Sequence, residues 1–176
     1  MIPENILPAK YLQQWCVAGG WAASPAQATD QDVWVYDIAV DQLNVVRLEL
    51  LQHLALMRKA KKLPYYKPED SSERAAAGYM HPCLILKVAE IRPFFPAKPV
   101  HLMVTNAMAP GEIIGGFDIN THAVAIRYDG AIYTHPKWEP VTKPPMALLN
   151  TDTTPARMVK LAKRYGHPIP EEVAIG

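Results

Sequence analysis

Apolar residues along this chain follow two spacings, and each spacing predicts one kind of element. Between residues 42 and 61 they recur every three or four positions, as they do on the buried face of an amphipathic helix. A long helix is therefore expected over 42–61, with Asp41 immediately before it as the N-terminal cap. Shorter helical segments are expected at 8–14, 24–27, 110–114 and 155–165.

Short apolar runs bounded by glycine, proline or polar residues predict strands. They comprise a run that ends at Gly19 and the segments 32–38, 83–91, 100–105, 122–128 and 131–134. Asp129-Gly130 separates the last two and is a strong signal for a hairpin turn. The 17 prolines leave few places for long helices, and the polar segment 63–80 is expected to be a surface loop. Together these elements predict an α/β domain of the α+β type, with a small mixed sheet backed by helices.

The composition is that of an ordinary folded domain. The chain has 176 residues, of which 49% are hydrophobic and 20% charged, so one domain over residues 1–176 is expected. A formal net charge of +1 gives no general attraction to nucleic acid. The first residues lack the basic and apolar regions of a signal peptide, and no apolar stretch approaches membrane-spanning length. Cys16 and Cys83 are expected as reduced, buried thiols, with a disulfide as the alternative. The prediction is therefore a cytoplasmic protein that does not contact membranes.

Two neighbouring segments contain the candidate chemistry. One apolar run ends in Gly19 and Gly20, and the next run opens with Asp30 and Asp32. In a strand, residues two apart point to the same face, so the two carboxylates are expected side by side, where they can bind a divalent cation such as Mg²⁺. The glycines allow the backbone to approach a phosphate closely, because no Cβ is in the way. The plainer alternatives are a polar strand end and a tight turn.

The first segment resembles the signature of the polymerase-β-like nucleotidyltransferases, which is a small residue and Gly-Gly followed by Asp-x-Asp and an apolar strand. Residues 117–125, Phe-Asp-Ile-Asn-Thr-His-Ala-Val-Ala, are similar to the Asp-Phe-Thr-Ile-Asn-Ala-Leu-Ala stretch of the CCA-adding and poly(A) polymerase head domains. Asp118 matches the aspartate of that motif. Two features depart from the family pattern: Gly115-Gly116-Phe117 replaces an arginine pair, and Gln31 replaces an apolar residue.

The resemblance implies specific roles for the acids. Asp30 and Asp32 would bind Mg²⁺ (or Mn²⁺), and the ion would orient a triphosphate for attack at its α-phosphorus. Asp118 would be a third carboxylate that either binds a second metal ion or recognises the sugar, and the alternative is a structural turn aspartate. His122 stands where the CCA-adding motif has asparagine, and a buried, hydrogen-bonded role is one interpretation.

The last predicted helix presents basic residues on one face. Arg157, Lys160 and Arg164 follow i, i+3, i+7 spacing, and such a stripe could bind a triphosphate or RNA phosphates. A charged, solvated surface is the competing interpretation. The Lys-Arg-Tyr-Gly end of this helix is also similar to segments of small viral and phage nucleotidyltransferase-like proteins, which indicates a phage or viral protein.

Three functions follow from these observations. The first is metal-dependent transfer of a nucleoside monophosphate from a nucleoside triphosphate, such as ATP, to a hydroxyl on RNA, a protein or a small molecule. The second is a catalytically inactive protein of the same fold that binds and regulates or inhibits a partner protein. The third is a small interaction protein in which the acids are incidental. We expect the first.

Overall fold

The computed structural model describes residues 2–63, 66–70, 83–93, 97–149 and 155–169, and for 66–70 the backbone alone. Its strands are β1 (Trp15–Ala18), β2 (Gln31–Val35), β3 (Tyr66–Asp70), β4 (Ile85–Pro93), β5 (Val100–Thr105), β6 (Val124–Arg127) and β7 (Ile132–Thr134). The α-helices are α1 (Gly20–Ala23), α2 (Leu43–Lys59), α3 (Pro110–Gly115) and α4 (Pro155–Tyr165), and single 3-10 turns lie at Ala9–Tyr11, Val40–Gln42 and Asn120–His122.

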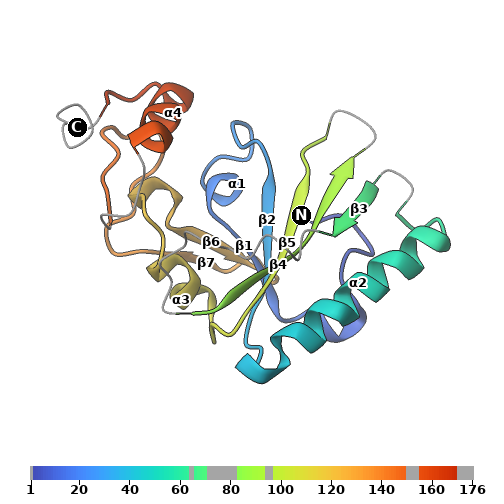
Figure 1. Ribbon diagram of the computed structural model, residues 1–176. Helices are drawn as coiled ribbons and strands as arrows, with labels where there is room; N and C mark the ends of the chain where they lie inside the picture. The colour runs from blue at the N-terminus through green and yellow to red at the C-terminus, as the bar shows by residue number, and fades with distance from the viewer. Residues whose placement is uncertain (1, 64–65, 71–82, 94–96, 150–154, 170–176) are drawn as a thin grey trace.

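The strands form one sheet in the order β3-β4-β5-β2-β1-β6-β7 (Figure 1). β2 and β5 run parallel at its centre, and every other pair of neighbours is antiparallel. The sheet is therefore mixed and helices pack against it, which confirms the predicted α+β class. The predicted hairpin is present as β6 and β7, with Gly130 in the turn at a positive φ.

Helix α2 covers one face of the sheet, along β3, β4 and β5 (Figure 1). It buries Val46, Leu50 and Leu54, which are spaced four residues apart, so they form one stripe along the helix. These side chains pack with alternate residues of β2 and β5, including Val33 and Leu102, in the largest apolar cluster of the described chain. The long predicted helix is thus confirmed, two residues shorter than expected at its C-terminal end.

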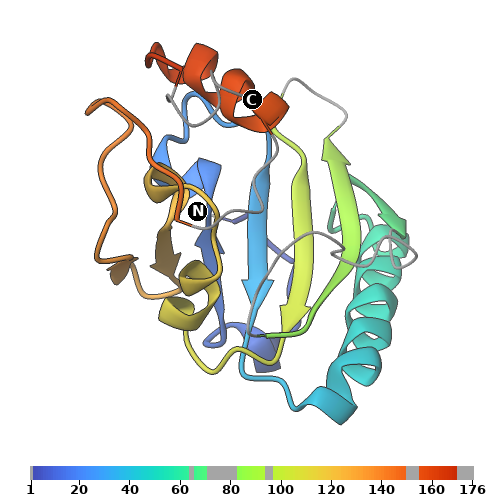
Figure 2. The same ribbon diagram turned by 60° about the vertical axis from the view of Figure 1, so that its left-hand side comes forward.

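The opposite face has a second apolar cluster that includes Trp34, Met103, Ile113 and Phe117. Helix α3 packs there against β1, β6 and β7. Helix α4 lies across the end of the sheet at which β2 and β5 begin (Figure 2). It is anchored by Met158, Leu161 and Ala162, which pack on Ile119 and Met146. On this second face, the apolar clusters do not cover the sheet where β2 and β5 begin. We call the second face of the sheet the cavity face.

The turn expected over 24–27 is present, because the carbonyl of Ser24 accepts hydrogen bonds from the backbone N–H groups of Gln27 and Ala28, while the hydroxyl of Ser24 bonds to Oε1 of Gln27. A separate helical turn, α1, lies before it at Gly20–Ala23.

Two other local predictions were wrong. Asp41 lies within a 3-10 turn, and Gln42 is the residue at the N-terminal cap position of α2. The segment 63–80, expected to be a loop, contains strand β3, which pairs with β4. The rest of that segment and the predicted cap Thr154 lie outside the described residues.

Two general predictions can also be compared with the structure. Cys16 and Cys83 are both free thiols. In the part of the chain that the structure describes, no helix combines the length and apolar character needed to cross a membrane.

Candidate functional site

The alternation of side chains along β2 and β5 places a polar cluster on the cavity face. In β2, Val33 and Val35 point toward α2, so Asp32 and Trp34 point the other way. In β5, Leu102 likewise points toward α2. The two strands are paired so that Asp32 lies directly opposite His101, and both side chains therefore share the cavity face.

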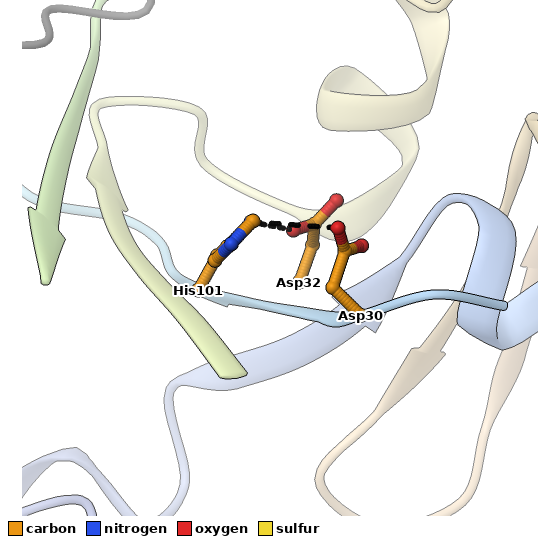
Figure 3. Close-up of side chains that lie close together, drawn as sticks. All are labelled: Asp30, Asp32 and His101. Carbon is orange, nitrogen blue, oxygen red and sulfur yellow. Dashed lines mark hydrogen bonds and ion pairs between the residues drawn. The ribbon is translucent and has the colours of Figure 1, made fainter. Parts of the chain in front are cut away.

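Asp30, Asp32 and His101 converge at this point, the two acids from the start of β2 and the imidazole from β5 (Figure 3). His101 Nδ1 lies 3.1 Å from Oδ1 of Asp32 and 3.9 Å from Oδ2 of Asp30. One ligand atom from each residue lies within 4.8 Å of the others, and all three side chains are partly buried. Ligand atoms that share one ion at about 2.1 Å are roughly 3–4 Å apart, so the cluster fits a divalent cation. The predicted proximity of the two carboxylates is confirmed.

The electrostatics of this cluster reflect its crowding. Burial raises the pKa of Asp30, and the neighbouring Asp32 carboxylate raises it further, while His101, Arg164 and Lys87 oppose the rise. The hydrogen bond to Asp32 is the main cause of a raised pKa at His101, and burial partly offsets it. The protonated form of His101 is thus favoured by the two carboxylates, and a divalent cation bound there would compete with that proton.

The glycine pair lies immediately beside the acids. Gly19 has φ of +93°, a conformation that favours glycine, and a Cβ there would lie 3.9 Å from Oδ2 of Asp32. Gly20 opens α1, and a Cβ there would lie 3.4 Å from the ring of His122, which is tight. The turn therefore needs glycine at Gly19 for its backbone, and at Gly20 it leaves room for an imidazole.

A cavity of about 390 Å³ opens in front of these residues. Every residue predicted for the site lines it: Gly19, Gly20, Asp30, Asp32, Asp118, Arg157, Lys160 and Arg164. Arg157, Lys160 and Arg164 all reach it from α4, as their helical spacing predicts. The cavity thus combines a cluster that fits a cation with three basic side chains that fit an anion.

Asp118 lines the same cavity but pairs with a basic residue. Its Oδ2 accepts a hydrogen bond of 2.9 Å from Nε of Arg157, and Nη2 of the same guanidinium lies 3.5 Å from Oδ1. The contact joins the turn after α3 to the first turn of α4. The third side chain beside Asp30 and Asp32 is His101. Asp118, for which a metal ion, the sugar and a structural turn were the alternatives, pairs with Arg157 in the same cavity.

His122 is buried and hydrogen-bonded, as one interpretation of the sequence predicted. Its Nε2 lies 2.7 Å from the hydroxyl of Tyr165 on α4, and its ring meets the tyrosine ring edge-on. Burial lowers the pKa of His122 to about 4, and the positive charge of Arg157 contributes in the same direction. At neutral pH this histidine is therefore an uncharged link between the cavity and α4.

Two lining residues, His101 and Lys87, did not emerge from the sequence. Each interrupts an apolar run in its strand, and this pattern indicates which face of the sheet the side chain lies on but not which strand is its neighbour. Only the parallel pairing of β2 with β5 brings His101 to Asp32. No family model matches the chain, and no curated protein is similar enough to match it.

Proposed function

We propose that the cavity binds a nucleoside triphosphate together with a divalent cation, Mg²⁺ or Mn²⁺, and that the chain transfers the nucleoside monophosphate to a hydroxyl acceptor. The observation that carries this proposal is the lining of one cavity by the Asp30–Asp32 pair and by the basic residues of α4. A triphosphate suits both, because it pairs with basic side chains and ligates cations. The resemblance of the two sequence motifs to the polymerase-β-like nucleotidyltransferases is an independent support.

The proposed reaction is a substitution at the α-phosphorus. The acceptor hydroxyl oxygen forms a bond to that phosphorus, the bond to the oxygen that bridges the α- and β-phosphates breaks, and pyrophosphate leaves. The proton of the hydroxyl passes to a carboxylate of the Asp30–Asp32 pair and from there to solvent. A divalent cation, when bound by this pair, supplies positive charge to the phosphate oxygens.

The basic residues would serve the other part of the ligand. Arg157, Lys160 and Arg164 on α4 and Lys87 on β4 all line the cavity, so they can neutralise the triphosphate and then the pyrophosphate. Gly19 leaves space next to Asp32, which lets a phosphate oxygen approach the carboxylate and its cation.

A second candidate is a protein of this kind that binds nucleotide without transferring it and regulates a partner protein. The specific observation that favours it is the pairing of Asp118 with Arg157, which leaves two carboxylates in the cluster with His101. Loss of one carboxylate from a two-metal site removes ligands that the second metal ion needs.

Turnover separates the two candidates. Each of the four nucleoside triphosphates, labelled at the α-phosphate, is incubated with the protein, Mg²⁺ or Mn²⁺, and RNA, protein and polyol acceptors. We expect release of pyrophosphate and transfer of the label to one acceptor class, and loss of both with Asp32→Asn. Asp41→Asn is the matched control, since Asp41 is exposed and does not line the cavity. Metal-dependent nucleotide binding without pyrophosphate release would favour the second candidate.

A further inference from the structure

A row of three polar side chains crosses the centre of the sheet on the cavity face. Glu90 of β4 lies opposite His101 of β5, and His101 lies opposite Asp32 of β2. Nε2 of His101 is 4.0 Å from Oε1 of Glu90, and Nδ1 is 3.1 Å from Oδ1 of Asp32. Each ring nitrogen of His101 thus has a carboxylate beside it, one on either side of the imidazole.

A β-bulge in β4 produces this row. Lys87 pairs with Met103 and Ala89 pairs with Leu102, so Val88 is an extra residue. An unbroken antiparallel ladder would place Ala89 opposite His101. The bulge shifts the register by one residue and brings Glu90 there in its place. It also lets Lys87, before the bulge, and Glu90, after it, both point to the cavity face, although they are an odd number of positions apart.

Glu90 is itself held in position. Nε of Arg92 donates a hydrogen bond of 3.1 Å to the same Oε1 that faces His101. The side chain of Glu90 is largely buried, with 18% exposed, whereas that of Arg92 is 59% exposed. The Glu90 carboxylate is therefore fixed against the imidazole by a cation on its solvent side.

This order of groups is that of a carboxylate–histidine–metal unit. In such units one ring nitrogen binds the metal, and the other donates its proton to a carboxylate that fixes the ring and makes it a stronger ligand. At 4.0 Å, Nε2 of His101 and Oε1 of Glu90 lie beyond hydrogen-bond distance, so the unit requires the two groups to approach by about 1 Å when a cation binds. Asp30, Asp32 and Nδ1 of His101 provide the metal-binding side of the unit.

We propose that His101 ligates the cation directly through Nδ1, that Glu90 is its positioning residue, and that the site prefers a first-row transition metal over Mg²⁺. This inference rests on the proposed function and specifies which cation the same cavity takes. Mg²⁺ prefers oxygen ligands, whereas imidazole nitrogen suits transition metals, whose affinities rise from Mn²⁺ toward Cu²⁺. A cluster of two carboxylates and one imidazole should therefore favour transition-metal ions more than a cluster of three carboxylates does.

The test uses the metal alone, without nucleotide, on the full chain. Mn²⁺ binding is followed by electron paramagnetic resonance, and pulsed measurements detect the coupling of a directly bound ¹⁴N nucleus. We expect Mn²⁺ to bind the wild type at least about tenfold tighter than Mg²⁺ does in competition, with a ¹⁴N coupling that His101→Asn abolishes. His101→Asp should retain binding, lack the coupling and shift the preference toward Mg²⁺.

Glu90 is tested by a graded pair of variants. Glu90→Gln keeps an acceptor for the imidazole N–H but loses its charge, and Glu90→Ala loses both. Mn²⁺ affinity should fall in the order wild type, Gln, Ala, with a total loss of about 10- to 100-fold, as is typical of such supporting residues. His135→Asn and Glu49→Gln are matched controls outside the cavity and should leave the affinity unchanged.

Two results would overturn the inference. One is Mn²⁺ binding without a ¹⁴N coupling and with equal affinity in His101→Asn, which would make the imidazole a bystander. The other is an absence of Mn²⁺ binding to the folded wild type. Neither result decides the proposed function, because nucleotide binding and turnover in the presence of Mg²⁺ are measured separately.

Discussion

The two faces of the sheet use alternate residues of the same strands but differ in character where β2 and β5 begin. On the α2 face, Val33, Val35 and Leu102 are fully buried against a helix whose inner stripe is entirely apolar. On the cavity face, the residues between them include Asp32 and His101, both partly exposed and facing a cavity. In each strand, adjacent positions thus serve two environments that differ in polarity and in access to water.

The difference shows how a small domain can accommodate a charged cluster. Charged groups are costly to bury unless they are paired and hydrogen-bonded. Because the α2 face supplies a continuous apolar core, the cavity face does not need to be closed by apolar side chains where β2 and β5 begin. Because the α2 face supplies the core and the cavity face supplies the site, stability and ligand binding should respond to different substitutions.

The largest effect on stability should come from the α2 face. Leu50→Ala removes a side chain that is 0% exposed in the main cluster, and we expect a loss of about 3 kcal/mol in the free energy of unfolding. Denaturant titration measures it. Leu56→Ala, on the same helix but 61% exposed, should change stability by less than about 0.5 kcal/mol. Similar losses for both variants would contradict the assignment of the core.

The next effect concerns His122, a buried cavity residue whose ionisation is coupled to folding. His122 has a pKa of about 4 in the folded protein, below the ordinary value of 6.5, chiefly because it is buried. The unfolded chain therefore binds more protons between these values. The contribution of His122 to the free energy of unfolding is complete above pH 6.5. It is lost as the pH falls toward 4, by about 3 kcal/mol in total.

Unfolding free energies of wild type and His122→Gln, measured at a series of pH values from 4 to 7, test this. The wild type should lose more stability than the variant over that range, whatever the absolute stability of the variant. Parallel curves would mean that His122 is not protonated on unfolding, and hence that it is not buried as a neutral ring.

An effect of comparable size, on cation binding and not on stability, should come from the cavity face. Asp32→Asn removes the carboxylate that lies between Asp30 and His101 in the cluster, and we expect a loss of divalent-cation affinity on the order of 100-fold, or about 2.7 kcal/mol. The unfolding free energy should stay nearly constant, since the substitution also relieves the repulsion between the two acids. The opposite pattern would contradict this prediction: Asp32→Asn would lose stability, and Leu50→Ala would lose cation affinity.

The smallest effect should come from helix α4. Arg164→Met removes one positive charge from the cavity lining, and we expect nucleoside triphosphate affinity to fall roughly tenfold, or about 1.4 kcal/mol, with a weaker dependence on salt. Lys163→Met is the matched control, because Lys163 is exposed and does not line the cavity. Calorimetry at two salt concentrations compares them. Equal effects from both variants would indicate a diffuse charged surface.

The parts of the site that the sequence predicts are those determined by local spacing. Asp30 and Asp32 are two residues apart in a strand, and Arg157, Lys160 and Arg164 share a helix face, so each group is fixed by the geometry of a single element. Gly19 follows similarly, from a turn that needs a positive φ. The α+β class and the long helix follow from the two apolar spacings.

The other parts depend on which strands become neighbours. The alternation along β5 places His101 on the other face of the sheet from the valine and leucine side chains of that strand. Nothing local indicates that β5 pairs in parallel with β2. The bulge at Val88 is likewise invisible in the sequence, and it decides that Glu90 and not Ala89 reaches the imidazole. For Asp118 the motif indicated a third acid, whereas the structure pairs it with Arg157 from a distant helix.

A divalent cation at Asp30 and Asp32 and a triphosphate against α4 are proposed to share one cavity. The decisive measurement is calorimetric titration of the four nucleoside triphosphates, with and without Mg²⁺ or Mn²⁺, into wild type, Asp32→Asn and Arg164→Met. We expect binding that requires the cation, is lost in Asp32→Asn and is weakened in Arg164→Met. Binding that is independent of the cation and equal in all three proteins, or an absence of binding to the folded wild type, would contradict it.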